Sequence, residues 1–363
     1  MTMQKRTIWF LLLLVILLFA YVGSRLLMVF YTDFLWFTQL GYRSVFTTIA
    51  WTKIIAFACF FTVFILLAGT NVWIARRYGL TTRVMPLEVV VGGEYPNFPD
   101  AARLQQWAWV GAVGGLGFFV AIAGVPIWPI ALKYLNALDF HIADPIFNRD
   151  IGFFVFNLPL YTYLQGWLQV VVLLIALLVL ASYYRDHSLR NDEKTWTSTH
   201  HVTAHISGLG ALFALLLAWG YRLKEYELLY SFRKSPFFGA GYTDLHVQYY
   251  AYRLLLVLAI VLAIGLLYNL HFRQWRIPGY GATGYFIAIL LFSWLSPVLY
   301  EQFIVKPNEL KLETPYIQHA IDFTRKAYGL DRVEEVPFPG ESNLTSEDIQ
   351  NNLPTIRSIP LWD

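Results

Sequence analysis

Long apolar stretches alternate with shorter polar ones along the whole chain, and this pattern predicts membrane-spanning helices. Seven apolar runs cover about 8–30, 49–75, 107–132, 160–184, 203–221, 253–270 and 285–305. A helix needs roughly 20 apolar residues to cross a hydrocarbon core about 30 Å thick. Because lipid offers the backbone no hydrogen-bond partner, such runs must be helices rather than open strands. The sequence therefore predicts an all-α fold, a polytopic membrane bundle of seven transmembrane helices.

The composition agrees with a membrane protein. Hydrophobic residues make up 57% of the chain, aromatic residues 18% and charged residues only 14%, whereas soluble domains carry about 25% charged residues. The net charge of +3 is too small and too spread to indicate a nucleic-acid partner. The only cysteine, Cys59, lies inside the second run, which excludes an intrachain disulfide.

Basic residues in the loops predict the orientation. Lys5 and Arg6 precede the first run, so the positive-inside rule puts the N-terminus in the cytoplasm. Loops on that side carry further basic residues: Arg76, Arg77, Arg83, Arg103, Arg185, Arg190, Lys194, Arg273 and Arg276. The third outer loop is an exception, with Arg222, Lys224, Arg233 and Lys234. We expect a multi-pass protein of the cell (plasma or inner) membrane with its C-terminus outside.

The chain changes character after the last run. We expect a membrane domain over 1–305 and an extracytoplasmic tail over 306–363, which at about 58 residues is too thin to bury its own core. Thr314-Pro315 predicts a helix start and Gly329 its end, and Thr345 with Asp348 predicts a capping box. The polar and aromatic segment 133–159 predicts short interfacial helices.

Two histidines four residues apart are candidate metal ligands. His201 and His205 share one face of the helix that opens the fifth run, but no Glu lies between them as in the zinc-hydrolase signature. Interfacial histidines that cap a helix or reach the interface are commoner than metal ligands, so a structural role for this pair is favoured.

A second candidate cluster needs two outer loops to meet. His141, Asp144 and Asp150 lie in one loop, and Asp244 and His246 in another. Together they could hold a divalent cation. The alternative is that the carboxylates cap backbone amides, as they usually do at turns, and this alternative is favoured.

Glycine, proline and charge inside the runs suggest packing rather than chemistry. Gly111 and Gly115 predict close helix packing, and Pro126, Pro129 and Pro297 predict kinks or span ends; all lie within or beside predicted spans. Other charged residues lie near span ends: Arg25, Lys53 and Glu301. Because ionisable residues in spans usually mark ion paths, their absence near span midpoints argues against a proton- or sodium-coupled transporter.

Several motifs resemble one known family. They are YTDFLWF at 31–37, DPIFNRDIGF at 144–153, GYTDLH at 241–246, VKPNEL at 305–310, ETPYI at 313–317 and TRKAYGLD at 324–331. Together they are similar to uncharacterised protein family 0182, bacterial and cyanobacterial membrane proteins. The resemblance implies seven N-terminal spans followed by a large extracytoplasmic domain, of which this chain would contain the membrane half and the start. It implies no activity.

Three functions remain open. The first is a non-enzymatic scaffold or assembly factor of the envelope, with the bilayer and envelope proteins as partners of its outer loops and tail. The second is a transporter or channel for a neutral or lipidic solute. The third is an outer-face enzyme on a lipid-linked substrate, through Asp144, Asp150, Asp244 and His246. No catalytic set, cofactor site or metal site is predicted.

Overall fold

The fold is all-α, as predicted from the apolar runs. The computed structural model describes residues 2–80, 99–185, 189–192, 195–198, 200–232, 238–334, 336–337 and 345–360. Its longer helices are α1 (Thr2–Gln39), α2 (Arg43–Leu80), α3 (Pro99–Gly124), α5 (Leu158–Arg185), α6 (His200–Glu227), α7 (Tyr249–Phe272), α8 (Arg276–Ala288) and α10 (Glu309–Ala327). The shorter α-helices are α4 (Trp128–Leu135), α9 (Ser296–Tyr300), α11 (Ser346–Asn351) and α12 (Leu353–Arg357). A small antiparallel hairpin, β1 (Leu189–Asp192) and β2 (Thr195–Ser198), lies between α5 and α6.

Six helical segments in the described part of the chain are long and apolar enough to cross a membrane. They are Arg43–Tyr78, Trp107–Leu135, Phe153–Arg185, His201–Tyr230, Asp244–Phe272 and Arg276–Ala327. These six coincide with the second to seventh predicted runs. The first run, about 8–30, falls within α1, where many side chains lie outside the described residues. A seventh span therefore stays a prediction.

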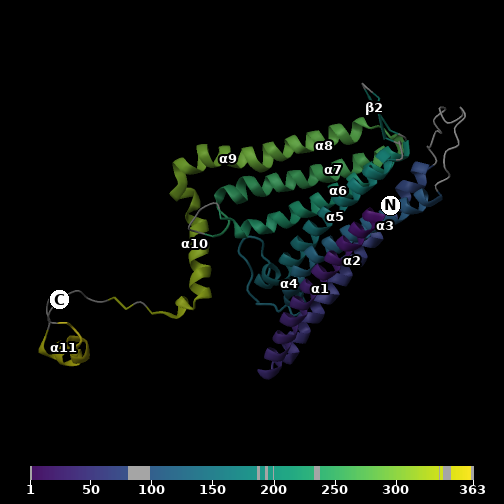
Figure 1. Cartoon of the computed structure of the whole chain (residues 1–363). Coiled ribbons are helices and arrows are strands. Elements are labelled where there is room, and N and C mark those ends of the chain that lie inside the picture. The colour runs from purple at the N-terminus through teal and green to yellow at the C-terminus, as the bar shows by residue number, and fades with distance from the viewer. Residues whose placement is uncertain are drawn as a thin grey trace, which may run out of the picture. The chain divides into compact units, whose positions relative to one another are not determined.

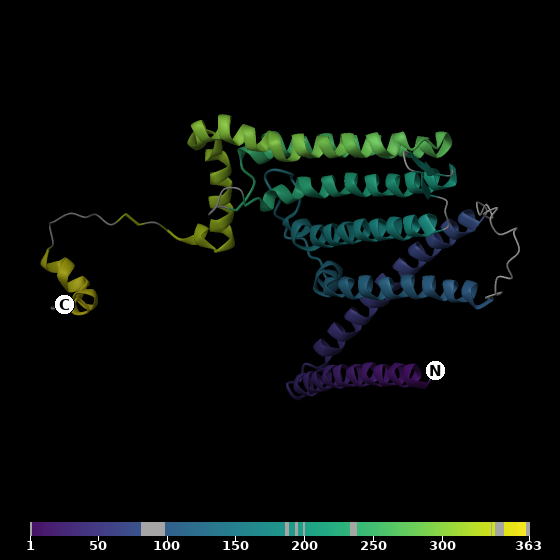
Figure 2. The same cartoon turned by 45° about the horizontal axis from the view of Figure 1, so that its top comes forward.

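The helices of residues 1–314 pack as neighbours in chain order. In both views α5, α6, α7 and α8 lie side by side, and α6 and α7 share the most extensive contact (Figures 1 and 2). Helix α2 packs against α3 and α5, and Figure 2 shows it running obliquely to that layer. The main core forms where these helices meet, around Phe64, Val171, Ile175, Val179 and Val202. Many apolar side chains elsewhere point outward, as expected of helices whose solvent is lipid.

The type of helix changes at the predicted prolines, although the helical segments Trp107–Leu135 and Arg276–Ala327 continue through them. Pro126 lies in a 3₁₀ turn, Val125–Ile127, and Pro129 opens α4. Pro297 opens α9, directly after a π-helical segment, Ile289–Leu295. Proline lacks the N–H that a continuing α-helix needs and clashes with the preceding turn. Further π-helical segments cover Phe153–Asn157, Asp244–Gln248 and Glu301–Val305.

Close packing of α3 depends on other glycines than predicted. A Cβ built on Gly111 or Gly115 would meet nothing within 4 Å, so the prediction for this pair is wrong. A Cβ on Gly117 would lie 3.0 Å from Phe64, and one on Gly124 only 2.3 Å from Phe60. The helix pair α2–α3 is thus tight toward the end of α3 and open toward its start.

The prediction of interfacial helices over 133–159 is wrong for its middle. Helix α4 ends at Leu135, and 136–150 form a loop in which His141 and Asn148 have positive φ angles of 57° and 51°. Asp144 and Asp150 in this loop accept hydrogen bonds from nearby backbone N–H groups. Such local bonds compete with helix formation.

The predicted helix start at Thr314-Pro315 is also wrong. Helix α10 begins at Glu309, and Pro315 lies inside it. The residues before α10 are already helical: Glu301–Val305 is π-helical and Lys306–Asn308 forms a 3₁₀ turn. The hydroxyl of Thr314 donates back to the carbonyl of Leu310, so it serves no cap.

Contacts within the chain form two units, 1–314 and 315–363. In the second unit Gly329 has a φ of 66° and ends the helical stretch, as predicted. Thr345 caps α11, and its capping box with Asp348 is complete, which confirms that prediction. The predicted start of an outer tail at Lys306 stays a prediction.

Candidate functional site

Charged side chains gather at one end of the first unit, where α6 ends and α7 begins. We call this set the polar rim: Arg149, Arg222, Glu225, Asp244, Arg253, Glu301 and Glu313. Three of its carboxylates are almost fully enclosed, since Glu225, Asp244 and Glu313 are exposed by only 1%, 1% and 4%. Ionised groups rarely tolerate such burial unless they are paired or hydrogen-bonded. The contacts of these carboxylates therefore decide what the rim can do.

Glu225 holds two arginines from different helices. Arg222, one turn earlier on α6, donates to Glu225 Oε2. Arg253 of α7 lies with its Nε 3.7 Å from the same oxygen. Because Arg222 and Arg253 remain 44% and 53% exposed, water still solvates part of each guanidinium. This ion pair joins the end of α6 to the start of α7.

Aromatic rings complete the arginine contacts. The Arg149 guanidinium lies 4.7 Å from the ring centre of Phe153 and 5.1 Å from that of Tyr226. Arg222 lies 4.8 Å from the Tyr226 ring and donates to its hydroxyl at 2.8 Å. Cations over ring faces at these distances are attracted by the ring quadrupole. The basic residue Arg222, an exception to the predicted charge pattern, is thus bound within the protein.

Glu313 and Glu301 hold the turn that starts α7. Both carboxylate oxygens of Glu313 accept the backbone N–H of Tyr242, at 3.2 and 3.1 Å. Thr243, exposed by only 1%, donates its hydroxyl to Glu301. A Cβ on Gly241 would lie 3.1 Å from the Glu313 carboxylate, so a larger residue there would require this carboxylate to move by a few tenths of an ångström. The second turn of α10 is therefore fastened to the residues that precede the π-helical segment Asp244–Gln248.

The carboxylates of the predicted cation cluster cap backbone amides, as the favoured alternative states. Asp144 Oδ2 accepts the N–H groups of Ile146 and Phe147 at 2.9 and 2.6 Å. Asp150 Oδ1 accepts those of Phe140 and Gly152 at 3.1 and 2.6 Å. Desolvation opposes the ionised form of Asp150, but these backbone donors outweigh it and lower the pKa of Asp150 below its usual range.

Asp244 and His246, two further members of that cluster, make contacts within their own segment of the chain. Asp244 Oδ2 accepts the N–H of Gly241 at 3.1 Å. His246 stacks on Tyr242, with ring centres 3.9 Å apart, and its Nδ1 lies 3.1 Å from the Tyr242 carbonyl oxygen. Within the described ranges, no group of three or more His, Cys, Asp or Glu side chains is arranged to hold a metal ion.

His201 and His205 serve two different contacts. His201 stacks on Tyr78, with ring centres 4.8 Å apart. His205 uses both ring nitrogens: Nε2 lies 3.0 Å from Asn71 Oδ1 and Nδ1 lies 3.0 Å from the Tyr183 hydroxyl. Since Asn71 Oδ1 is an acceptor, Nε2 carries the proton and Nδ1 accepts from Tyr183. This arrangement joins α2, α5 and α6 and leaves no lone pair of His205 for a metal.

Comparison with known proteins agrees with the motifs. The model of the uncharacterised protein family UPF0182 matches residues 8–363. The chain belongs to UPF0182. A UPF0182 protein of Trichodesmium erythraeum is 34% identical over 96% of this chain and 37% of its own length. Those of Cupriavidus necator and Geobacter sp. are 37% and 32% identical, over 91% and 99% of this chain and 36% and 40% of their own lengths.

The UPF0182 chain thus spans less than half the length of these curated relatives. No solved structure matches it. The family match confirms the resemblance drawn from the motifs. Three of these motifs contribute residues to the polar rim: Asp144–Phe153, Gly241–His246 and Glu313–Ile317.

The sequence missed the central residues of the polar rim. Glu225 and Arg222 are three apart, a spacing at which helix side chains meet, so this pair was open to prediction. Arg253 and Glu313 offer no such signal, because they lie far along the chain from their partners. Only folding brings them together.

Proposed function

We propose that this UPF0182 chain is a non-enzymatic membrane scaffold that holds the start of α10 in a fixed position at the outer face of the cell membrane. One observation carries the proposal: Glu313, buried at the start of α10, binds the Tyr242 backbone with both carboxylate oxygens. The two oxygens share this one N–H, and a hydrogen bond to a buried, ionised acceptor contributes stability that a mobile tail would not need. The start of α10 is thereby held by the helix bundle.

The proposal includes the topology. Seven spans, with the first within α1, put the cytoplasm at the end that carries Arg76, Arg77 and Arg185. The polar rim then lies outside the membrane, at the opposite helix ends. Its arginines do not contradict the positive-inside rule, because Glu225 and the aromatic rings bind them.

Hydrogen bonds of three aspartates to backbone amides support a structural role over chemistry. Asp144, Asp150 and Asp244 each accept backbone N–H groups of their own loops. A catalytic acid or base needs access to a substrate proton at hydrogen-bond distance. Carboxylates committed to backbone amides shape a rigid surface instead, and a rigid surface suits an assembly partner.

Site-specific photocrosslinking in the native membrane tests the scaffold. A photoreactive residue at Leu310, which is 80% exposed beside Glu313, should capture the same envelope protein in every preparation. Glu313→Ala should abolish this product while the chain still inserts. A matched probe at Leu177, 54% exposed on α5, should capture lipid only. Products limited to lipid and the chain itself at Leu310 would reject the scaffold.

A transporter for a lipidic solute is the second candidate. It is favoured by a cavity of about 640 Å³ between α2 and α3. Purified chain in vesicles that carry a fluorescent lipid in one leaflet would then speed lipid exchange between leaflets. Exchange no faster than in protein-free vesicles would leave the scaffold as the function.

A further inference from the structure

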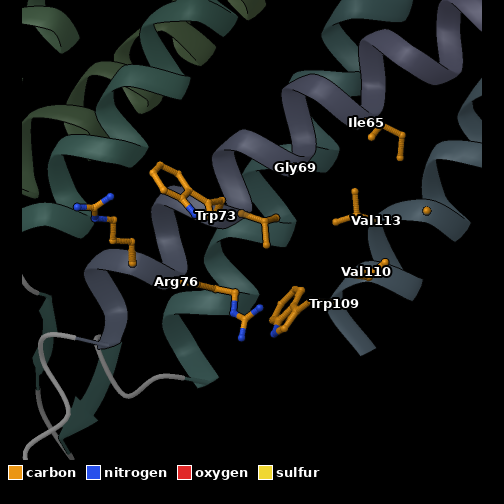
Figure 3. Close-up of a pocket in the computed structure, with 10 residues that line it drawn as sticks. Ile65, Gly69, Trp73, Arg76, Trp109, Val110 and Val113 are labelled. Carbon is orange, nitrogen blue, oxygen red and sulfur yellow. The ribbon is translucent and has the colours of Figure 1, made fainter. Parts of the chain in front are cut away.

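A groove between α2 and α3 lies at the helix ends remote from the polar rim. Its cavity of about 640 Å³ is lined by residues of these two helices only. Figure 3 shows Arg76 reaching from α2 toward the ring of Trp109 on α3, with Trp73, Gly69 and Ile65 following along α2. Arg77 also lines the cavity, and its guanidinium lies 5.3 Å from the Trp73 ring centre. Charge is thus confined to one end of the groove.

The groove changes from polar to apolar along its length. Arg76, Arg77 and the two tryptophans lie at one end, and Ile65 and Val113 line the other. Tryptophan rings prefer the headgroup level of a bilayer. From Arg77 to Ile65 a helix rises about 18 Å, which is close to half of a hydrocarbon core about 30 Å thick. The groove therefore runs from the headgroups toward the bilayer centre.

Two glycines keep the groove open. A Cβ added at Gly69 of α2 or at Gly114 of α3 would meet nothing within 4 Å. Farther along the same helix pair, added Cβ atoms at Gly117 and Gly124 would meet Phe64 and Phe60 at 3.0 and 2.3 Å. The helices are closed there and separate toward the arginines.

The arginines at the groove have no acidic partner in the part of the chain that the structure describes. Among the described side chains, the ion pairs join Arg222 and Arg253 to Glu225. Arg76 is half-buried, so its charge is partly removed from water. A partly desolvated cation beside an apolar channel is complementary to a molecule with an anionic head and an apolar tail.

We propose that the α2–α3 groove binds a phospholipid with an anionic headgroup. The headgroup phosphate pairs with Arg76 and Arg77, and one acyl chain lies along Gly69 and Gly114. Guanidinium groups match phosphate oxygens in charge and in hydrogen-bond geometry. In the proposed topology this lipid comes from the cytoplasmic leaflet, and the groove itself does not depend on the scaffold function.

Lipid binding to the full chain in detergent, measured by native mass spectrometry, tests the charge. Phosphatidylglycerol should bind more tightly than phosphatidylcholine with the same acyl chains. Arg76→Gln and Arg77→Gln should each weaken phosphatidylglycerol binding about fivefold, as expected for one cation at an anionic lipid surface. Arg185→Gln, which removes an exposed charge at the end of α5, should leave binding unchanged.

Filling the groove tests the shape with both arginines intact. Gly69→Leu and Gly114→Leu put apolar atoms into the cavity without a backbone clash, and each should reduce phosphatidylglycerol binding at least tenfold. Gly115→Leu is the matched control, since Gly115 is exposed, has open space for a Cβ and does not line the groove. It should bind like the parent chain.

Several results would overturn the lipid site. Equal binding of phosphatidylcholine would reject the anionic headgroup, and equal losses in Arg185→Gln would reduce the effect to general surface charge. Displacement of the bound lipid by millimolar inorganic phosphate would show a phosphate site rather than a lipid site. Unchanged binding in the filled variants would exclude the groove. None of these outcomes bears on partner capture at Leu310, so the two proposals fail separately.

Discussion

The two ends of the helix bundle use arginine in opposite ways. At the polar rim, Arg222 and Arg253 share the buried carboxylate of Glu225 and lie beside aromatic rings. At the α2–α3 groove, Arg76 and Arg77 line a cavity of about 640 Å³. Arginine thus stabilises the fold at one end of the bundle and offers its charge to a ligand at the other end.

This difference shows how a charged residue near a span end can be interpreted. An arginine whose acid is supplied by the protein stabilises the fold and leaves little charge for recognition. The arginines at the groove lie beside an open apolar channel, and no described acid forms an ion pair with them. Such arginines add little to the stability of the fold and can bind an anionic ligand. Counting basic residues along the sequence cannot separate the two cases.

Removal of Glu225 should have the largest effect on stability, because it leaves both arginines of the polar rim without their acid. Loss of one partner of a buried ion pair costs roughly 3–5 kcal/mol. Because both arginines are about half exposed and can regain water, we expect Glu225→Ala to lower the free energy of unfolding by about 3 kcal/mol. Denaturation in mixed detergent micelles measures this loss.

Two variants control the Glu225 result. Adding Arg222→Met to Glu225→Ala should restore part of the stability, since one uncompensated cation disappears. Asp139→Asn removes an exposed charge from the same end and should change the free energy of unfolding by less than about 0.5 kcal/mol. A loss below about 1 kcal/mol for Glu225→Ala would mean that the ion pair is only a surface contact.

The helices were predictable, and much of the rim was not. Apolar runs of about 20 residues leave helix as the only way to satisfy the backbone in lipid, and six of the seven runs coincide with the six apolar helices described. The capping role of Asp144 could be expected from its place before Pro145. The contact between Glu313 and Tyr242 joins residues 71 positions apart in the chain, so no local sequence pattern predicts it.

The groove illustrates a second limit of the sequence. Glycine in a span predicts close helix approach, and Gly111 and Gly115 met that pattern although both lie open. Whether a glycine closes or opens a helix pair depends on the side chains facing it. Phe60 faces Gly124, whereas no heavy atom within 4 Å faces a Cβ at Gly69.

Gly124→Ala should lower the free energy of unfolding, because Gly124 lies in the closed part of the α2–α3 pair. The added methyl group would lie 2.3 Å from the Phe60 ring, so helix or ring must shift. Overpacking of this kind costs roughly 1–3 kcal/mol, and we expect about 2 kcal/mol. Unfolding in mixed micelles measures the loss. Gly115→Ala should cost nothing, and equal behaviour of the two variants would contradict the tight end.

Tyr183→Phe should have a smaller effect beside the groove. It removes the hydroxyl that donates to His205 Nδ1 at 3.0 Å and leaves a buried acceptor unpaired, which costs about 1 kcal/mol. The unfolding free energy of Tyr183→Phe tests this value. A chelator should leave the stability of the parent chain unchanged, since His205 donates its other nitrogen to Asn71. A loss of stability on chelation would instead support a metal on the histidines.

The smallest predicted effect is a loss of stability at acid pH through Asp150. The lowered pKa of Asp150 in the folded chain means that its stabilising contribution is complete above the unfolded value of about 3.9. That contribution is lost as pH falls through the lower folded pKa. Asn at this position does not titrate, so the parent chain should be more stable than Asp150→Asn at pH 7, and the gap should narrow only below about pH 4. Unfolding in mixed micelles between pH 7 and pH 3 gives the two curves. A gap that already closes near pH 6 would contradict the assignment of this acid response to Asp150.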